Sequence, residues 1–439
     1  MANKKIIVTA AQVYLWGERV GTVAWDDQTG VAAFDYDPQF IKSGLEISPI
    51  YMPLSTDVYS FPELKMQSQN GLPGLLADSL PDRFGNKLID DWLQINGREP
   101  GSLNPIEKLL FEGSRGMGAL EYRPAINTGS MESTPIAIDK LALLAADVVN
   151  KKKDLSVNLI KHPTDALLSL IQIGSSAGGA RAKAVIAYNP STGEMRSGQT
   201  TVPEGFEHWI IKFDGMRDQD LGDPDGYGRI EAAYYLMALK ANIKMMPCEL
   251  LEEKGRAHFM TKRFDRLPGN EKVHVQSLNA LQHYDHRAEN KYSYEQVFST
   301  ILKLGLDHEH AQEMYRRMVF NILARNQDDH TKNLSFIMDR QGSWRLSPAY
   351  DMVYQYDPLG KWARVHQLSA NGKRDNFTLA DLEKIAEKFE IYKAKEIRNQ
   401  VADAVALWPP LAQEKGVRPE IIKAIKSNHR LDILKNIFL

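Results

Sequence analysis

The sequence predicts an α+β fold with a β-rich N-terminal part, a mixed middle region and a helical C-terminal half. A chain of 439 residues is longer than one compact core usually organises, which favours two or three domains. Short β-rich runs fill the first part, and apolar residues at helical spacing dominate after residue 265. Apolar, charged and aromatic residues make up 43%, 25% and 9% of the chain, ordinary values that favour neither a disordered nor a fibrous protein.

The first predicted domain covers residues 1–150 and begins with a β meander. Strands are expected over residues 13–16, 20–25 and 31–36, because β-rich runs there are separated by turn sequences. A helix is expected after Pro81 and Asp82, where apolar side chains recur at helical spacing, and another over residues 138–149. The polar stretch 150–154 marks the end of this domain.

The second predicted domain covers residues 151–265, and the third covers residues 266–439. In the second, a glycine cluster at 174–179 precedes strands over 183–188 and 208–213 and a helix over 229–241. The third domain is expected to be helical, with helices over residues 293–304, 311–324, 379–389, 393–407 and 419–428.

Charge and cysteine content restrict the possible partners and the compartment. Lys and Arg number 54 against 56 Asp and Glu, and the net charge of −2 gives no general attraction for a phosphate backbone. Direct DNA binding is therefore not expected. The single cysteine, Cys248, excludes an internal disulfide framework and is read as a buried structural thiol. With no signal peptide and no membrane-length apolar stretch, a cytoplasmic location is expected.

The sequence RNQDDHTKNLSF, residues 325–336, concentrates titratable and amide side chains after a predicted core helix. Asp328 and Asn333 are separated by four residues, a gap that protein kinases use in their catalytic loop. There an Asp orients or deprotonates the substrate hydroxyl, and the Asn binds magnesium. The alternative is a polar loop in which Asp328 caps a turn and Asn333 opens a strand.

A second acidic residue follows the predicted hairpin of strands 334–338 and 343–346. Asp351 in LSPAYD would return beside the catalytic loop, where kinases place their second magnesium ligand. Asp351-Met352-Val353 would stand in place of the familiar Asp-Phe-Gly. The alternative role for Asp351 is to cap a helix after Pro348.

Cations for a nucleotide are predicted in the middle domain. Lys212 ends an otherwise apolar strand, as the nucleotide lysine of kinases does, and Glu231 on the following helix is its candidate partner. The alternative is an edge strand with Lys212 in water. A weak signal comes from the glycine cluster before Lys183, which can bring backbone amides near phosphates. In HFMTKRFDR, a hinge at Phe264 and Asp265 would receive adenine and ribose, unless Asp265 pairs with a neighbouring arginine.

Taken together, these segments resemble the HipA family of serine/threonine kinases, the toxins of bacterial toxin-antitoxin pairs, over nearly the whole chain. GLLADSLPDRFGNKLIDDWL is similar to a segment of the family's N-terminal domain, and SSAGGARAK to its phosphate loop. HWIIK, RIEAAYYLMA and KRFDR resemble its nucleotide-lysine strand, following helix and hinge. NQDDHTKNLSF and LSPAYD resemble its catalytic and metal-binding motifs. The resemblance implies a two-lobed, protein-kinase-like fold with an extra β-rich N-terminal domain and a helical C-terminal lobe.

The resemblance also implies roles for individual residues. Asp328 would be the catalytic base, and Asn333 and Asp351 would hold magnesium. The positions implied to contact ATP are Ser176, Gly178, Gly179, Ala180, Lys183, Lys212, Lys262, Phe264, Asp265, His330 and Lys332. Ser176, with Ser175 as a rival, matches the serine whose autophosphorylation silences such kinases, and a phosphate there would repel ATP.

Two departures from the family pattern affect these assignments. Asp329 stands where the family usually has glycine and leaves the choice of base between neighbours open. Lys262 stands where an acidic hinge residue is common, which puts the adenine contacts in question.

The implied partners are a protein substrate, such as an aminoacyl-tRNA synthetase or another translation factor, and a small helix-turn-helix antitoxin that contacts DNA in place of this chain. Two other enzymatic functions stay open. One is a small-molecule kinase of a related fold. The other is a metal-dependent phosphohydrolase using Asp328, Asp329 and His330, with His283 and His286 as further ligands.

Overall fold

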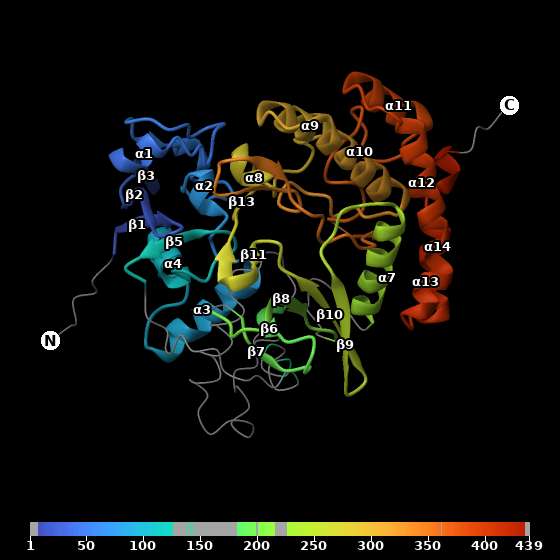
Figure 1. The fold of residues 1–439 in the computed structure, drawn as a ribbon, viewed down its shortest axis with the longest axis horizontal. Helices are drawn as coiled ribbons and strands as arrows, with labels where there is room; N and C mark the ends of the chain where they lie inside the picture. Colours follow the sequence, from blue (N-terminus) through green and yellow to red (C-terminus); the bar gives the residue numbers. More distant parts are fainter. Residues whose placement is uncertain are drawn as a thin grey trace.

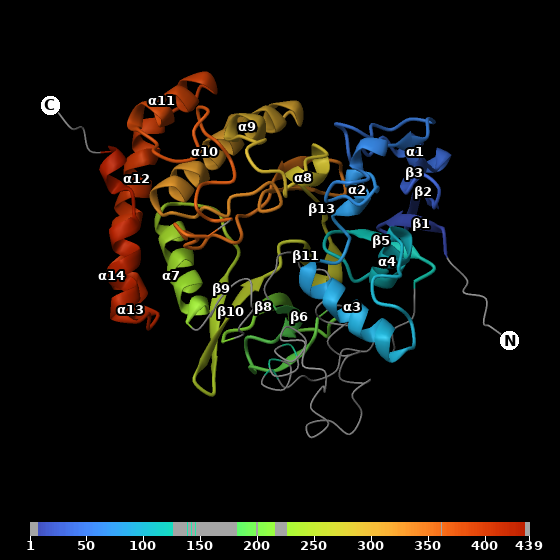
Figure 2. The same cartoon turned by 180° about the vertical axis from the view of Figure 1, so that it is seen from behind.

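The computed structural model describes residues 8–125, 182–198, 201–215, 226–360 and 362–434, together with the helical residues Ile138, Ala142 and Ala145. The predicted helix over residues 138–149 is described only at those three positions. Figures 1 and 2 show the β-rich N-terminal part on one side and the helical C-terminal half on the other, with a second sheet below and between them.

The N-terminal part is built on an antiparallel five-stranded sheet in the order β4-β3-β2-β1-β5. Its strands are β1 (Ala10–Leu15), β2 (Glu18–Asp26), β3 (Val31–Tyr36), β4 (Tyr59–Ser60) and β5 (Leu120–Arg123). Three helices accompany them: α1 (Pro38–Ser43), α2 (Gly74–Ala77) and α4 (Pro105–Glu112). Alternate strand residues such as Val13, Val23 and Phe34 pack with Ile106 and Leu109 of α4 into one core, as the period-two pattern of the sequence predicts.

A second five-stranded sheet, ordered β7-β6-β8-β10-β9, forms the middle region. It contains β6 (Lys183–Tyr188), β7 (Met195–Ser197), β8 (Glu207–Lys212), β9 (Cys248–Glu253) and β10 (Arg256–Lys262), and α7 (Tyr227–Lys240) follows β8 in the chain. Helix α3 (Arg83–Ile95) lies in the first predicted domain, yet its Phe84 and Leu88 share a core with Trp209 and Ile211 of β8. The first two predicted domains therefore share buried apolar surface, and the boundaries near 150 and 265 stay predictions.

The contact between α7 and β10 leaves no room for a side chain at Gly228. An added Cβ there would lie 2.2 Å from the carbonyl oxygen of Ala257, a backbone atom that cannot turn aside. We expect Gly228→Ala to lower the free energy of unfolding by about 1–3 kcal/mol despite the better helix propensity of alanine. Urea denaturation checks this, with Gly116→Ala as control because a Cβ on Gly116 meets nothing within 4 Å. Equal midpoints for the two variants would contradict the packing argument.

The C-terminal half is mostly helical. Its helices are α8 (Leu278–Leu281), α9 (Tyr294–Lys303), α10 (His308–Leu323), α11 (Leu379–Lys388), α12 (Ala394–Ala406), α13 (Trp408–Glu414) and α14 (Pro419–Asn428). A three-stranded sheet, β13 (His274–Ser277), β14 (Ser335–Met338) and β15 (Trp344–Leu346), lies beside them, and β11 (Arg266–Leu267) pairs with β12 (Glu271–Lys272). Met314, Met318 and Ile322 of α10 are fully buried, as their spacing predicts.

These elements confirm the α+β fold class. None of the helices in the described part of the chain is long and apolar enough to span a membrane.

Candidate functional site

The centre of the site is Lys212, at the end of β8. Its Nζ lies 2.6 Å from Oε1 of Glu231 on α7 and 2.5 Å from Oδ1 of Asp351, which follows β15. Strand β8 is central in its sheet, so the alternative of an edge lysine in water is wrong. One ammonium therefore joins the second sheet, its helix and the C-terminal half.

The local structure explains why Asp351 reaches Lys212. Strands β14 and β15 pair as the predicted hairpin, and the next residues are anchored by the backbone hydrogen bond from Ala349 N to Lys244 O, 2.8 Å long. Asp351 then adopts a left-handed backbone with φ 53°, a conformation that non-glycine residues take mainly at turns and functional sites. No helix begins after Pro348 within residues 349–360, so the helix-cap alternative is also wrong.

The charges of this cluster stabilise one another. Burial disfavours the charged form of Lys212, but the carboxylates of Asp351 and Glu231 outweigh it and raise the pKa of this lysine. Burial likewise opposes ionisation of Asp351, yet Lys212 and Lys183 lower its pKa. The carboxylates of Asp351 and Glu231 thus keep the Lys212 ammonium charged at neutral pH.

Asp328 and Asp329, the neighbouring acids of the catalytic-loop motif, have different surroundings. Asp329 is buried and accepts hydrogen bonds from the Tyr294 hydroxyl (2.6 Å), His366 Nδ1 (2.8 Å) and the Gln367 backbone N–H (2.7 Å). Burial opposes the charge of Asp329, but His366 lowers its pKa. This carboxylate holds the loop in place and has no oxygen left for a substrate, which favours Asp328 as the base.

Asp328 is less enclosed than Asp329. Its side chain is 30% exposed, accepts a hydrogen bond from Trp362 Nε1 at 2.5 Å and lies 3.7 Å from His330 Nε2. Burial of the carboxyl raises the pKa of Asp328, and His330 and Trp362 oppose that shift. A carboxylate with a raised pKa accepts a proton more readily.

The side chains of Asn333 and Asp351 each carry oxygen atoms of the kind that magnesium prefers. The amide nitrogen of Asn333 donates to the Asp328 backbone carbonyl at 2.9 Å, which leaves the amide oxygen for an ion. Among the described residues, no three His, Cys, Asp or Glu side chains form a metal-binding group. Magnesium fits such a site, because it usually takes one or two protein ligands and completes its shell with phosphates and water.

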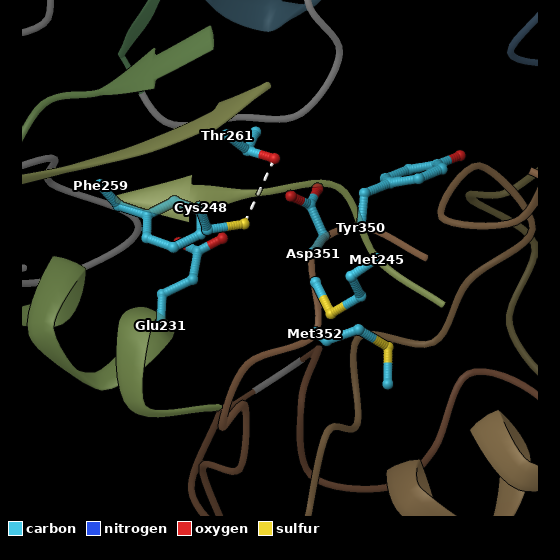
Figure 3. Close-up of a pocket in the computed structure, with 8 residues that line it drawn as sticks. All are labelled: Glu231, Met245, Cys248, Phe259, Thr261, Tyr350, Asp351 and Met352. Atoms are coloured by element: carbon cyan, nitrogen blue, oxygen red, sulfur yellow. Dashed lines mark hydrogen bonds between the residues drawn. The ribbon is translucent and has the colours of Figure 1, made fainter. Parts of the chain in front are cut away.

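A hollow beside Asp351 lies between the second sheet and the C-terminal half. It is lined by Glu231, Met245, Cys248, Phe259, Thr261, Tyr350, Asp351 and Met352. Figure 3 shows Asp351 and Tyr350 opposite strand β10, which carries Phe259 and Thr261. Phe264, predicted at the hinge, stacks on Tyr350, one of the lining residues, with ring centroids 5.8 Å apart.

Cys248 lines the hollow as a free, half-buried thiol. It donates to the Met246 carbonyl, and burial raises its pKa to about 12. Because the thiolate is the reactive form, we expect iodoacetamide at pH 8 to modify Cys248 at least about 100-fold more slowly than a free cysteine. Mass spectrometry of native and guanidinium-unfolded protein measures the two rates. Equal rates would show that the thiol is neither buried nor protonated.

Three lysines predicted to contact ATP interact with acidic side chains outside the Lys212 cluster. Lys183 Nζ is buried and lies 3.6 Å from Oδ2 of Asp82, the N-cap of α3. Lys262 Nζ pairs with Glu207 at 2.6 Å. Burial raises the pKa of Asp78 and of Asp82 in the N-terminal part, and the positive charge of Lys332 opposes that rise. Contacts of Lys183, Lys262 and Lys332 with ATP stay predictions.

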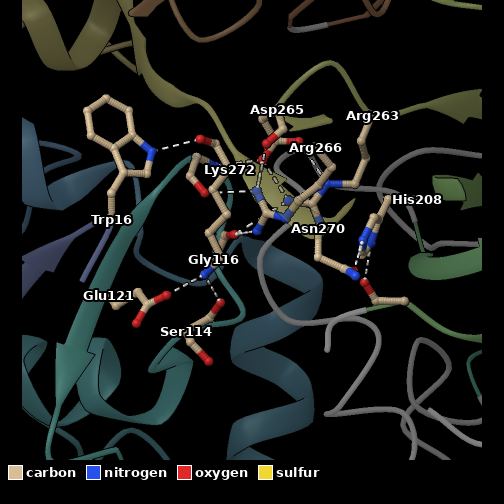
Figure 4. Close-up of polar contacts among 12 residues, drawn as sticks. Trp16, Ser114, Gly116, Glu121, His208, Arg263, Asp265, Arg266, Asn270 and Lys272 are labelled. Carbon is tan, nitrogen blue, oxygen red and sulfur yellow. Dashed lines mark hydrogen bonds and ion pairs between the residues drawn. The ribbon is translucent and has the colours of Figure 1, made fainter. Parts of the chain in front are cut away.

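The ribose role of the Asp265 side chain is wrong. Asp265 is fully buried, and its oxygens accept from Arg263 (2.7 and 2.8 Å), Arg266 (2.7 Å) and the Gly118 N–H (2.7 Å). Figure 4 shows this network, in which Arg266 and Arg263 also donate to the carbonyl of Gly116. The carboxylate therefore ties β10 to the N-terminal part.

Five predicted site residues lie outside the described residues: Ser175, Ser176, Gly178, Gly179 and Ala180. Their assignment to a phosphate loop stays a prediction.

Residues 11–123 match the family model for the HipA N-terminal domain, and residues 175–408 match that for the HipA-like C-terminal domain. The chain belongs to the HipA family. Over 95% of both chains its fold matches HipA in the Shewanella oneidensis complex of HipA, HipB and operator DNA, with a TM-score of 0.64 and 16% identity.

Two curated relatives of this HipA-family chain are described as candidate kinases. One from Haemophilus influenzae is 32% identical over 103 residues, and one from Sinorhizobium fredii, Y4dM, is 29% identical over 231 residues. The matched regions are 22% and 48% of this chain, and they span 30% and 55% of the two relatives.

The HipA-family chain also contains site residues that sequence reasoning missed. Trp362 contacts Asp328 from 34 positions along the chain, and Tyr350 stacks on Phe264. Asp82 reaches Lys183 from the other matched domain. Of these three residues, only Tyr350 could have been found from the sequence, because it directly precedes Asp351. The ligand set of the phosphohydrolase alternative is not assembled, since Asp329 is saturated and His283 accepts from the Gly74 N–H.

Proposed function

We propose that this HipA-family chain is an ATP- and magnesium-dependent serine/threonine protein kinase. The observation that carries the proposal is the pairing of Lys212 with both Glu231 and Asp351, because it joins a phosphate-binding cation to a metal-binding carboxylate. Asp328 and Asn333 complete the set from the catalytic loop.

The reaction would be an in-line transfer of the γ-phosphoryl group. The hydroxyl oxygen of a serine or threonine attacks the γ-phosphorus, the bond to the β–γ bridging oxygen breaks, and ADP leaves with that electron pair. Asp328 takes the proton of the hydroxyl, a role that its exposed carboxylate and raised pKa support. When bound between Asn333 and Asp351, magnesium would neutralise negative charge on the phosphates.

Transfer from labelled ATP tests the proposal. With magnesium present, wild-type protein is expected to phosphorylate itself or an added protein, and Lys212→Met to lose at least about 100-fold of that rate. Lys240→Met, which removes an exposed lysine at the end of α7, should keep the wild-type rate. No transfer by wild type to protein, or transfer only to small metabolites, would refute a protein kinase.

Autophosphorylation would fall on Ser176, or on its neighbour Ser175, and would switch the enzyme off by repelling ATP. Mass spectrometry of wild type and Asp328→Ala after incubation with ATP locates the phosphate. The substrate would be a protein such as an aminoacyl-tRNA synthetase or another translation factor, which phosphopeptide mapping beside the inactive variant would identify.

The partner would be a small helix-turn-helix antitoxin. The solved relative from Shewanella is a complex with HipB and operator DNA, and the net charge of −2 here gives DNA no general attraction. Gel-shift assays are expected to show operator binding by the pair and not by this chain alone. Equal binding by the chain alone would contradict this division of roles.

A further inference from the structure

A single segment, residues 362–367, contacts both acids of the catalytic loop. Trp362 donates its indole N–H to Oδ1 of Asp328, and His366 and Gln367 donate to Asp329. The two ends of this short segment are thus fixed on neighbouring carboxylates. The same backbone that anchors the loop through Asp329 therefore also sets where the indole meets Asp328.

The contact with Asp328 differs in kind from those with Asp329. Asp329 is closed off by three donors, whereas Trp362 supplies the one side-chain hydrogen bond to Asp328 that the described part of the structure contains. That bond engages Oδ1 and leaves Oδ2 of the partly exposed carboxylate for a substrate. An indole N–H can only donate, so it cannot take over the proton that Asp328 accepts.

Trp362 is itself held in place. Its carbonyl oxygen accepts from Gln367 Nε2 at 2.7 Å, and its ring meets that of His330 edge-on, with centroids 6.1 Å apart. Gln367 also contacts Asp329, and His330 lies near Asp328. The indole of Trp362 therefore meets Asp328 in a defined orientation. A hydrogen bond to a charged carboxylate from a fixed donor restricts the rotation of that carboxylate.

We propose that Trp362 is a positioning residue for phosphoryl transfer, holding one oxygen of Asp328 so that the other accepts the proton of the substrate hydroxyl. This inference rests on the proposed kinase function. Trp362 acts through Asp328 and takes no part in bond making or breaking. Removal of its N–H should therefore slow the chemical step and leave ATP binding as it is.

The decisive substitution keeps the shape of the ring. A tryptophan analogue with sulfur in place of the indole N–H, incorporated at position 362, is expected to lower kcat about ten-fold while KM for ATP stays within about two-fold. Trp362→Phe should show a loss of similar size. Trp344→Phe is the matched control, because the Trp344 indole N–H donates to the Glu46 carbonyl and not to a catalytic-loop acid. It should leave both constants unchanged.

The outcomes separate this inference from the function on which it rests. If wild type transfers phosphate and the analogue protein matches its kcat, the positioning role is overturned and the kinase proposal stands. A rise in kcat would also overturn it, because the indole would then be blocking the substrate. A higher KM for ATP or a lower melting temperature in the analogue protein would assign Trp362 a structural role instead. No transfer by wild type would remove the kinase proposal itself.

Discussion

Replacing Asp328 by Asn should lower kcat for phosphoryl transfer by about 10²–10⁴-fold, the range in which a general base contributes to catalysis. The amide has nearly the same shape as the carboxylate and can still accept from Trp362 Nε1, but it cannot take the proton of the substrate hydroxyl. KM for ATP should change little, because Lys212 and Asp351 are untouched. Steady-state kinetics with labelled ATP measure both constants.

Asp329→Asn is the matched comparison, one position along the chain. Asp329 accepts three hydrogen bonds in the interior, so its loss should lower the melting temperature, whereas Asp328→Asn should leave it close to that of wild type. Rates that fall only for Asp329→Asn, with full stability, would reverse the assignment of the base. Equal rates for wild type and Asp328→Asn would remove Asp328 from the mechanism.

Replacing Asp265 by Ala should destabilise the protein by about 3–5 kcal/mol. The change leaves Arg263 and Arg266 buried without their shared carboxylate and removes the acceptor of the Gly118 N–H. Chemical denaturation at pH 7 measures the loss. Asp27→Asn, at an exposed turn, should stay within about 0.5 kcal/mol of wild type.

The stabilisation that the Asp265 carboxylate provides should depend on pH. Burial opposes ionisation of Asp265, but Arg263 and Arg266 hold its pKa well below the ordinary value. Its stabilisation is therefore full above the unfolded pKa of about 4 and is lost as pH falls through the lower folded value. The difference in free energy of unfolding between wild type and Asp265→Ala should narrow below about pH 4. A constant gap from pH 7 down to pH 3 would show that the charge of Asp265 contributes nothing.

The elements that the sequence predicted well are those whose signals are local. Strands β3 and β6 were predicted to the residue, since each is a β-rich run bounded by turn or glycine-rich sequence. Helix α4 was missed although Asn104 and Glu107 form a capping box, because only two turns of helix follow it. Helix α13 was missed because it starts at Trp408 before two prolines, which normally indicate a break.

Among the site residues, too, those with a local sequence signal could be predicted and those without one could not. Lys212, Glu231 and Asp351 could be predicted because strand alternation, helix position and hairpin length each fix one of them. For Asp265 the sequence left both a ribose contact and a pair with a neighbouring arginine open, and the structure shows the arginine pair together with a bond from the distant Gly118 N–H. The pairing of Lys183 with Asp82 also joins residues far apart in the sequence, so spacing along the chain could not predict it. The contact of Trp362 with Asp328 has no local signature at all.

The central claim is that residues from three parts of the chain surround one triphosphate. A crystal structure with a non-hydrolysable ATP analogue and manganese, which gives an anomalous signal in place of magnesium, tests it directly. The expected result is an anomalous peak within about 2.5 Å of oxygens of Asn333 and Asp351, with the phosphates against Lys212 and the γ-phosphate facing Asp328. Nucleotide or metal bound away from these four side chains would contradict the claim.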